Sequence, residues 1–151
     1  MVQVVLPNDA NPLGFILGGT VMHLIDIAGA IACHRHTRSL LVTAAVDDLQ
    51  SLHSIKVGDL IILESHVTCV FTTSLEVHVD VYSEETLTGK RQLTSQAFLT
   101  FVAIDRNGAR VRIPPLIVET EAEKRVCEEA HARRAERLKR KATTLRNVLQ
   151  P

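Results

Sequence analysis

The chain has 151 residues, of which 46% are hydrophobic and 3% aromatic, and 17 Lys and Arg balance 17 Asp and Glu. This length suits one domain with or without an appendage, and the hydrophobic content is enough for a buried core. The net charge of zero excludes a general electrostatic attraction to nucleic acid or to a membrane surface, and no apolar run approaches the length of a membrane span.

The three cysteines, Cys33, Cys69 and Cys127, are few, odd in number and widely spaced. This usage argues against a disulfide framework and a zinc site, and it fits a reducing cytosol. His34 and His36 do not share a helical face, so they are expected to be polar residues at a helix end. The first residues also lack the basic start and cleavage site of a signal peptide. We therefore expect a cytoplasmic protein without a bound metal.

The first elements are a short strand, a loop and a helix. Val2 to Leu6 is apolar and β-branched, which predicts a strand that Pro7 and Pro12 end. Gly19 to about His36 is predicted to be helical. Its apolar residues fall nearly all round the helix, so this helix is expected to be buried on every side.

Four strands are expected next. Leu40 to Val46 is continuous and apolar, and Leu60 to Phe71 follows a Gly58-Asp59 turn. Apolar residues then alternate with polar ones from Leu75 to Tyr82, and period two recurs from Arg91 to Ile104. Short turns between successive strands indicate an antiparallel sheet. With one buried helix against it, this is an α+β architecture.

Pro114 and Pro115 end the sheet, and residues 119 to about 148 are rich in Ala, Glu, Lys and Arg, which favours a helix. We divide the chain into a domain at 1–115 and a charged helical extension at 116–151. The extension carries seven Lys and Arg from His131 onward against one acid. A solvated helix packed on its own or a neighbouring subunit explains this charge better than contact with coenzyme A phosphates or RNA, because acids alternate with the bases and aromatic residues are missing.

Residues 11–26 form the segment most indicative of chemistry. Asn11 begins a turn, Gly18-Gly19 leads into the helix, and Asp26 is a lone carboxylate in an apolar stretch. Free backbone N–H groups at a helix N-terminus suit a polarised carbonyl, and a desolvated carboxylate suits a base. A simpler explanation is that Asp26 bonds to neighbouring backbone or to His23, one turn away.

The segment from Asp9 to Ile31, with Asn11, Gly14, Gly18-Gly19 and Asp26, resembles the start of the hotdog-fold acyl-CoA thioesterases of the cytosolic acyl-CoA hydrolase group. Further matches lie at 42–47, 52–59, 73–77 and 99–105, so the resemblance covers roughly residues 3 to 115 and is fairly specific as a set. Departures are Ser54 where Pro is favoured, Gln50-Ser51 where an acid and Phe are usual, and Thr72 where Arg or Lys is frequent. The resemblance implies a long antiparallel sheet wrapped around a central helix.

The resemblance also implies hydrolysis of acyl-CoA thioesters to a free fatty acid and coenzyme A, which enters as part of the substrate and not as a cofactor. Gly19 and the Asn11 amide would polarise the carbonyl. Asp26 would either activate water as a general base or attack the carbonyl to give an acyl anhydride. The residues expected to bind substrate are Gly18, Thr20, Thr72, Thr73 and Ser74.

Asp26 lies seven residues beyond Gly19, about 10 Å along a helix axis, so one carbonyl cannot easily touch both. We therefore expect the site to form between two subunits, in a homodimer and further in a trimer of dimers, with acyl-CoA as its partner and no nucleic acid. Two alternatives stay open: a hotdog dehydratase acting on acyl thioesters, for which His23 is the nearby histidine, and a non-catalytic acyl-CoA sensor.

Overall fold

The computed structural model describes residues 1–150, which form one five-stranded antiparallel sheet with two long helices. The strand order is β1-β3-β4-β5-β2. Every predicted helix and strand is present, and the largest change of boundary is at β2, which runs on from the predicted end at Val46 to Ser51. The elements are β1 (Val2–Val4), a 3-10 turn (Pro7–Asp9), α1 (Gly18–Thr37), β2 (Leu40–Ser51), β3 (Leu60–Val70), β4 (Ser74–Glu84), β5 (Arg91–Ile104) and α2 (Glu121–Leu149).

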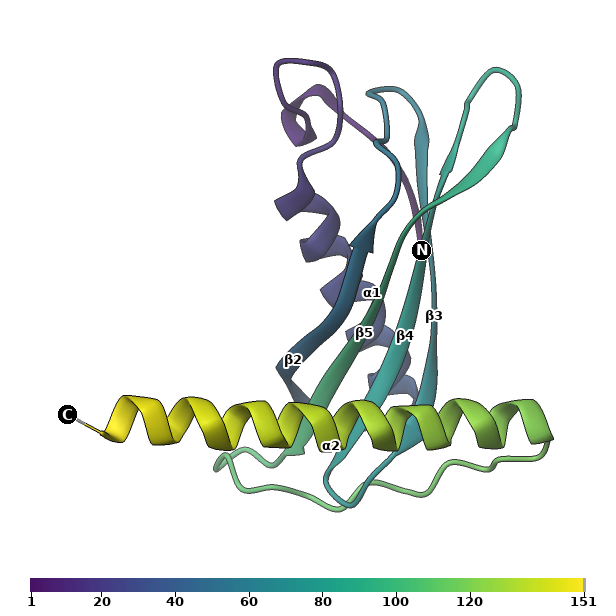
Figure 1. Cartoon of the computed structure of the whole chain (residues 1–151). Coiled ribbons are helices and arrows are strands. Elements are labelled where there is room, and N and C mark those ends of the chain that lie inside the picture. The colour runs from purple at the N-terminus through teal and green to yellow at the C-terminus, as the bar shows by residue number, and fades with distance from the viewer. Residues whose placement is uncertain (151) are drawn as a thin grey trace.

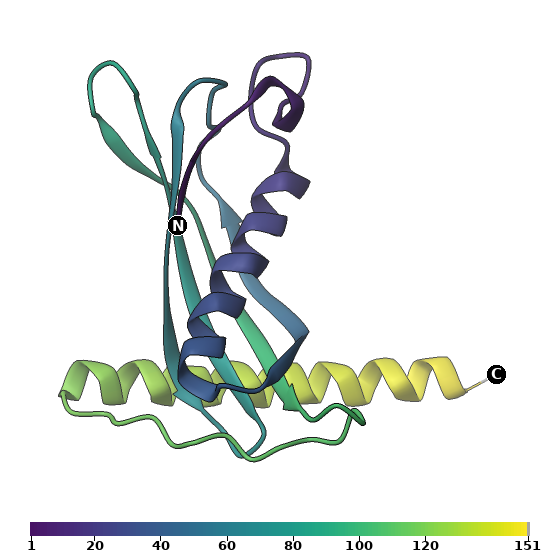
Figure 2. The same cartoon turned by 180° about the vertical axis from the view of Figure 1, so that it is seen from behind.

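Helix α1 packs along one face of the sheet (Figure 2). The side chains that β4 directs to this face are fully buried, as the alternation of the sequence predicts: Leu75, Val77, Val79 and Val81. Gly29 allows the close approach, because a Cβ atom there would lie 3.1 Å from Val77 Cγ1 and 3.2 Å from Phe101 Cε2. The core therefore lies between α1 and the central strands.

The expectation that α1 is buried on every side is wrong for the single chain. Its buried residues form one stripe that faces the sheet: Leu24, Ile25, Ala28, Gly29, Cys33 and Thr37. Outside this stripe Met22 is 47% exposed and Ile31 is 40% exposed. The apolar residues of α1 thus supply one face for the core and further exposed apolar positions that a partner can cover.

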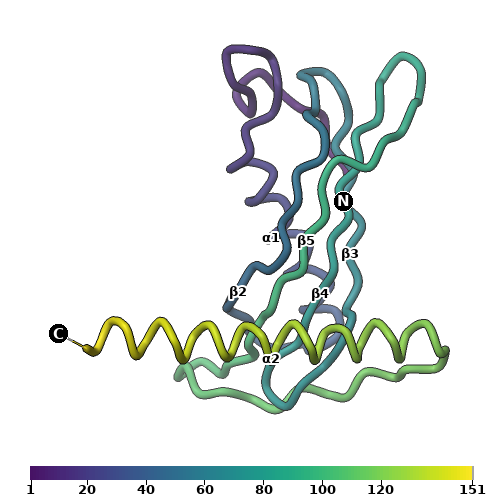
Figure 3. The backbone as a smooth tube through the Cα atoms, in the orientation of Figure 1, coloured from purple at the N-terminus to yellow at the C-terminus, as the bar shows by residue number. Residues whose placement is uncertain are grey.

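Helix α2 crosses the other face of the sheet at one end (Figure 1). The N-terminal loop and the start of α1 lie at the opposite end of the strands (Figure 3). A capping box begins α2, in which the Thr120 side chain accepts from the Glu123 N–H and the Glu123 carboxylate accepts from the Thr120 N–H. The division of the chain at residue 115 stays a prediction.

Polar contacts hold α2 on the sheet. Glu76 of β4 is 1% exposed and accepts two hydrogen bonds from Arg133, at 3.0 and 2.9 Å, and one from Thr68 at 2.7 Å. Arg133 also stacks over the Phe98 ring at 3.7 Å. The one fully buried residue of α2 within the described chain is Ala130. The helix therefore depends on ion pairs more than on apolar burial.

A covalent bond also joins α2 to the sheet. Cys69 of β3 and Cys127 of α2 form a disulfide, with Cα atoms 4.8 Å apart. The expectation that no disulfide forms is therefore wrong. Spacing along the sequence does not show that β3 and the first turns of α2 meet, and these two cysteines are 58 residues apart.

His78 of β4 lies beside the Glu76–Arg133 pair on the face that α2 crosses. Its ring stacks on Phe98 with centroids 4.5 Å apart, meets His66 edge-on at 5.4 Å, and lies 3.5 Å from Asp80. Burial lowers the pKa of His78 below its ordinary value of 6.5, and the charges of His66 and Arg133 act in the same direction against those of Asp80 and Glu76.

Within residues 1–150, no helix combines the length and apolar character needed to cross a membrane.

Candidate active site

The N-terminus of α1 presents free backbone donors. No side chain caps the helix, and the first helical hydrogen bond is donated by Val21 to the carbonyl of Leu17. The N–H groups of Gly18, Gly19 and Thr20 therefore precede the helical ladder. A Cβ atom on Gly18 or Gly19 would meet no atom within 4 Å, so the helix start is uncrowded at both positions. This end of the helix can receive a carbonyl oxygen or an anion.

Asn11 shapes the loop that precedes α1. Its Oδ1 accepts hydrogen bonds from the N–H groups of Leu13 at 3.0 Å and Phe15 at 3.2 Å. Gly14 has a φ of +83° at the tip, where a residue with a side chain would be strained. Because the side-chain oxygen of Asn11 accepts these two hydrogen bonds within the loop, the side-chain NH₂ group is the part left to donate to a ligand.

Asp26 lies on the middle of α1 and is half-buried. Its Oδ1 accepts a hydrogen bond of 2.6 Å from the hydroxyl of Thr43 on β2. The structure thus gives Asp26 a partner other than His23, which is exposed. Sequence reasoning missed Thr43, because its only signal is a polar residue inside an apolar strand.

Asp26 does not meet Asn11 or Gly19 within one chain. In the described residues none of its hydrogen bonds or ion pairs involves either of them, and seven residues of helix separate Asp26 from Gly19, about 10 Å along the axis. A single chain therefore presents two half-sites, one at the N-terminus of α1 and one at the Asp26–Thr43 pair.

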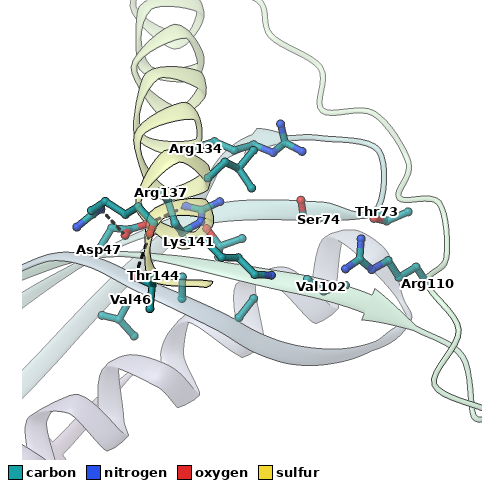
Figure 4. A pocket seen from close by; sticks show the side chains of 15 residues that line it. Val46, Asp47, Thr73, Ser74, Val102, Arg110, Arg134, Arg137, Lys141 and Thr144 are labelled. Carbon is teal, nitrogen blue, oxygen red and sulfur yellow. Dashed lines mark hydrogen bonds and ion pairs between the residues drawn. The ribbon is translucent and has the colours of Figure 1, made fainter. Parts of the chain in front are cut away.

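A basic cavity of about 530 Å³ lies between α2 and the ends of the strands (Figure 4). Of the predicted substrate-binding residues, Thr73 and Ser74 line it, whereas Thr72 does not. Five cations surround it: Arg110, Arg134, Arg137, Arg140 and Lys141. The charge of this helix was expected to face solvent or a neighbouring subunit. The structure instead directs much of it into a concave surface.

Within the cavity, Asp47 neutralises part of the charge. Its carboxylate lies 2.8 Å from Arg137 and 3.6 Å from Arg140. Arg134 lies over the Phe71 ring at 5.0 Å. For Arg110, Arg134 and Lys141 no ion pair is recorded in residues 1–150. The cavity therefore keeps a positive excess that suits an anionic group.

Comparison with known proteins identifies the family. The sequence model of the thioesterase superfamily matches residues 13–90. The chain belongs to the thioesterase superfamily. It is also 42% identical over 137 residues to an uncharacterized acyl-CoA thioester hydrolase of Bacillus subtilis, covering 91% of this chain and 80% of that protein.

Solved structures of thioesterases share this fold. An apo-hexameric acyl-CoA thioesterase superposes with a TM-score of 0.88 at 44% identity, covering 94% of this chain and 91% of that one. The acyl-CoA hydrolase of Staphylococcus aureus, in complex with butyryl coenzyme A, coenzyme A and coenzyme A disulfide, has a TM-score of 0.87 at 30% identity over 98% and 90% of the two chains. The expected hotdog fold is therefore confirmed.

The match to longer thioesterases is partial. This chain is 32% identical to the human cytosolic acyl coenzyme A thioester hydrolase over 135 residues, which is 88% of this chain and 36% of that protein. The chain thus spans about a third of the length of that relative.

The Staphylococcus aureus thioesterase has also been solved as variants in which an asparagine, an aspartate and a threonine are replaced by alanine. In that protein the aspartate follows the asparagine by fifteen residues, and the threonine follows the aspartate by seventeen. Asn11, Asp26 and Thr43 of this thioesterase have the same two separations.

One group of residues has the composition of a metal site. The donor atoms of Cys69, Cys127 and His131 lie within 4.8 Å of one another. In this structure the two sulfurs are bonded to each other, whereas a metal binds thiolates. His34 and His36 lie 2.9 Å from the carbonyl oxygens of Ser39 and Pro114, as expected for polar residues at a helix end.

Proposed function

We propose that this thioesterase hydrolyses acyl-CoA thioesters to a free carboxylic acid and coenzyme A, with the site assembled from two copies of the chain. The observation that carries the proposal is the carboxylate of Asp26, which Thr43 holds through one oxygen on a half-exposed helix face. The other oxygen is left to act on a substrate. The names of the relatives, which are acyl-CoA hydrolases and thioesterases, support the substrate class.

Two routes fit Asp26. As a general base, it accepts a proton from water while the water oxygen attacks the carbonyl carbon, and the proton passes to the departing coenzyme A thiolate. As a nucleophile, it forms an acyl anhydride and expels the thiolate, and water then cleaves the anhydride. In both routes the Gly19 N–H and the Asn11 amide donate to the carbonyl oxygen as negative charge develops on it. Neither route uses a cofactor, since coenzyme A enters with the substrate.

The chain offers an edge at which a second copy can complete the site. β2 is an edge strand of 12 residues, with one side of its backbone unpaired in the described chain. Its exposed side chains include large aliphatic ones: Leu40, Val42, Val46 and Leu49. A long apolar edge strand is suited to pairing with another strand. We propose a homodimer through this edge, and a trimer of dimers by similarity to the hexameric relative.

The basic cavity is our proposed site for the phosphate groups of coenzyme A. Phosphates prefer arginine-rich surfaces with hydroxyl donors, and the cavity supplies Arg134, Lys141, Thr73 and Ser74. Because phosphates and thioester lie at opposite ends of the pantetheine arm, a cavity distant from the N-terminus of α1 is compatible with one bound substrate. Gly18 and Thr20 are the proposed contacts near the thioester. The cytoplasm is our proposed location, by similarity to the cytosolic relative, and cell fractionation tests it.

The experiment combines a chain-length panel of acyl-CoAs with four variants. Asp26→Asn keeps the size of the side chain and removes the base, so we expect kcat to fall at least about 100-fold. Thr43→Ala and Asn11→Ala should lower kcat by about 10- to 100-fold. His23→Ala is the matched control, because His23 is exposed one turn from Asp26. It should stay within about two-fold of the parent.

The outcomes separate the alternatives. Thiol release that survives Asp26→Asn contradicts the mechanism. Binding of acyl-CoA without any thiol release indicates a sensor. If the parent protein converts acyl-CoA to a hydrated or dehydrated acyl-CoA and His23→Ala loses that activity, the protein is a dehydratase.

A further inference from the structure

The Cys69–Cys127 disulfide lies near the N-terminus of α2, the helix that forms one wall of the basic cavity. Cys127 lies in the second turn of α2, and Arg134 follows it by seven residues, two turns further along the same helix face. Lys141 lies two turns beyond Arg134. The disulfide to β3 thus lies on the same face of α2 as Arg134 and Lys141, which line the cavity.

The other contacts of α2 with the sheet are non-covalent. The helix has one fully buried residue within the described chain, Ala130, and its ion pairs join Arg133 to Glu76 and both Arg137 and Arg140 to Asp47. Arg133 also lies over the Phe98 ring, and Arg134 and His131 contact the Phe71 ring. The arginine side chains keep 17% and 19% exposure, whereas Glu76 and Asp47 are 1% and 9% exposed, so salt screens these pairs only in part. The disulfide is the covalent anchor of α2.

We propose that the Cys69–Cys127 disulfide is a redox-controlled tie that keeps α2 in place as the wall of the basic cavity, so that its reduction weakens binding of the phosphate-bearing end of acyl-CoA. This inference rests on the proposed function for its ligand. In a reducing compartment, a disulfide between two long elements fits a redox-sensing role better than a permanent structural one.

The reduction is an ordinary thiol–disulfide exchange. A dithiol attacks one sulfur of the cystine, a mixed disulfide forms and is resolved by the second thiol, and two electrons and two protons pass to the protein. The products are the free thiols of Cys69 and Cys127 and the oxidised dithiol. Cys69 is fully buried whereas Cys127 is half-buried, so the first attack is expected at the sulfur of Cys127.

The test compares the full chain after treatment with oxidised glutathione or with dithiothreitol, with a chelator present because His131 lies beside the two sulfurs. Activity is followed through the absorbance of the thioester bond, because dithiothreitol interferes with thiol-detecting reagents. Reduction should raise the KM for acyl-CoA and the Kd for coenzyme A at least about five-fold, with kcat within about two-fold. Amide hydrogen exchange in α2 should become faster.

Two variants serve as controls. Cys127→Ser should behave like the reduced protein under both treatments, whereas Cys33→Ser keeps the tie and should respond to dithiothreitol like the parent. An unchanged KM and unchanged exchange in α2 upon reduction would overturn the proposal, as would three free thiols in the protein after treatment with oxidised glutathione. Absence of thioester cleavage in both redox states refutes the proposed function instead, and hydrogen exchange then still decides whether the tie exists.

Discussion

Removing Arg133 tests how the C-terminal helix is held on the sheet. Glu76 is 1% exposed in the parent chain, and in Arg133→Ala the Thr68 hydroxyl at 2.7 Å would be its remaining side-chain partner. Breaking a buried ion pair by removing one partner costs about 3–5 kcal/mol, and loss of the contact with the Phe98 ring adds about 0.5–1 kcal/mol. Because Arg133 is 17% exposed, water can reach the vacated space. We therefore expect a total loss of about 3–4 kcal/mol in unfolding free energy.

The reverse deletion should cost less. In Glu76→Gln the arginine can turn towards water and the amide can still bond to Thr68, so the expected loss is about 1–2 kcal/mol. The double variant Arg133→Ala/Glu76→Gln should be more stable than Arg133→Ala alone, because no charge is then left buried without a partner. Arg125→Ala is the matched control on the exposed side of α2 and should change stability by less than about 0.5 kcal/mol.

Urea unfolding is followed by far-ultraviolet circular dichroism, since the chain has no tryptophan and one tyrosine. All variants are compared at one protomer concentration with the disulfide intact, because association and the covalent tie both add to apparent stability. If Arg133→Ala loses no more than about 1 kcal/mol beyond Arg125→Ala, the reasoning is refuted.

Three further predictions concern packing, pH and thiol reactivity. Gly29→Ala should be less stable than Gly19→Ala by about 1–3 kcal/mol in urea unfolding. The reason is that a new methyl group meets two core side chains at position 29 and no atom within 4 Å at position 19. Equal stabilities of the two variants would contradict this packing. Burial lowers the pKa of His78, so as the pH falls below 6.5 this histidine takes up a proton in the unfolded chain before it does so in the folded one. The free energy of unfolding should therefore decline as the pH falls, and His78→Gln should flatten that decline between about pH 7 and about pH 5. An unaltered dependence of stability on pH in the variant would disprove this. Burial raises the pKa of the Cys33 thiol to about 12. Thiol titration of the folded protein with its disulfide intact should therefore detect no reactive thiol, and denaturation should expose one. A fast-reacting thiol in the folded state would show that Cys33 is accessible.

Much of the fold was predictable because its signals are local. Alternation along β4 identified a strand with one buried face, and Pro114-Pro115 marked the end of the sheet before α2. The boundaries of β5 were predicted without error. These signals depend on side-chain periodicity and on turn chemistry, which neighbouring residues determine.

The candidate site was predictable in part. Asn11, Gly19 and Asp26 stand out as a turn, a helix start and a lone carboxylate, all within one short segment. Thr43 did not stand out, because its contact with Asp26 joins a helix to a strand 17 residues away. The exposed outer face of α1 was likewise missed, because an apolar residue has the same pattern whether its own chain or a partner covers it.

The sequence by itself determined the helices and strands, the antiparallel order of the hairpins and the residues that begin α1, since each follows from contacts between near neighbours. Tertiary structure alone decided which of the three cysteines pair, which face of the sheet α2 crosses, and that its arginines meet Asp47, Thr73 and Ser74 around one cavity. The physical reason is that these contacts join segments tens of residues apart, and the packing of the whole chain brings them together.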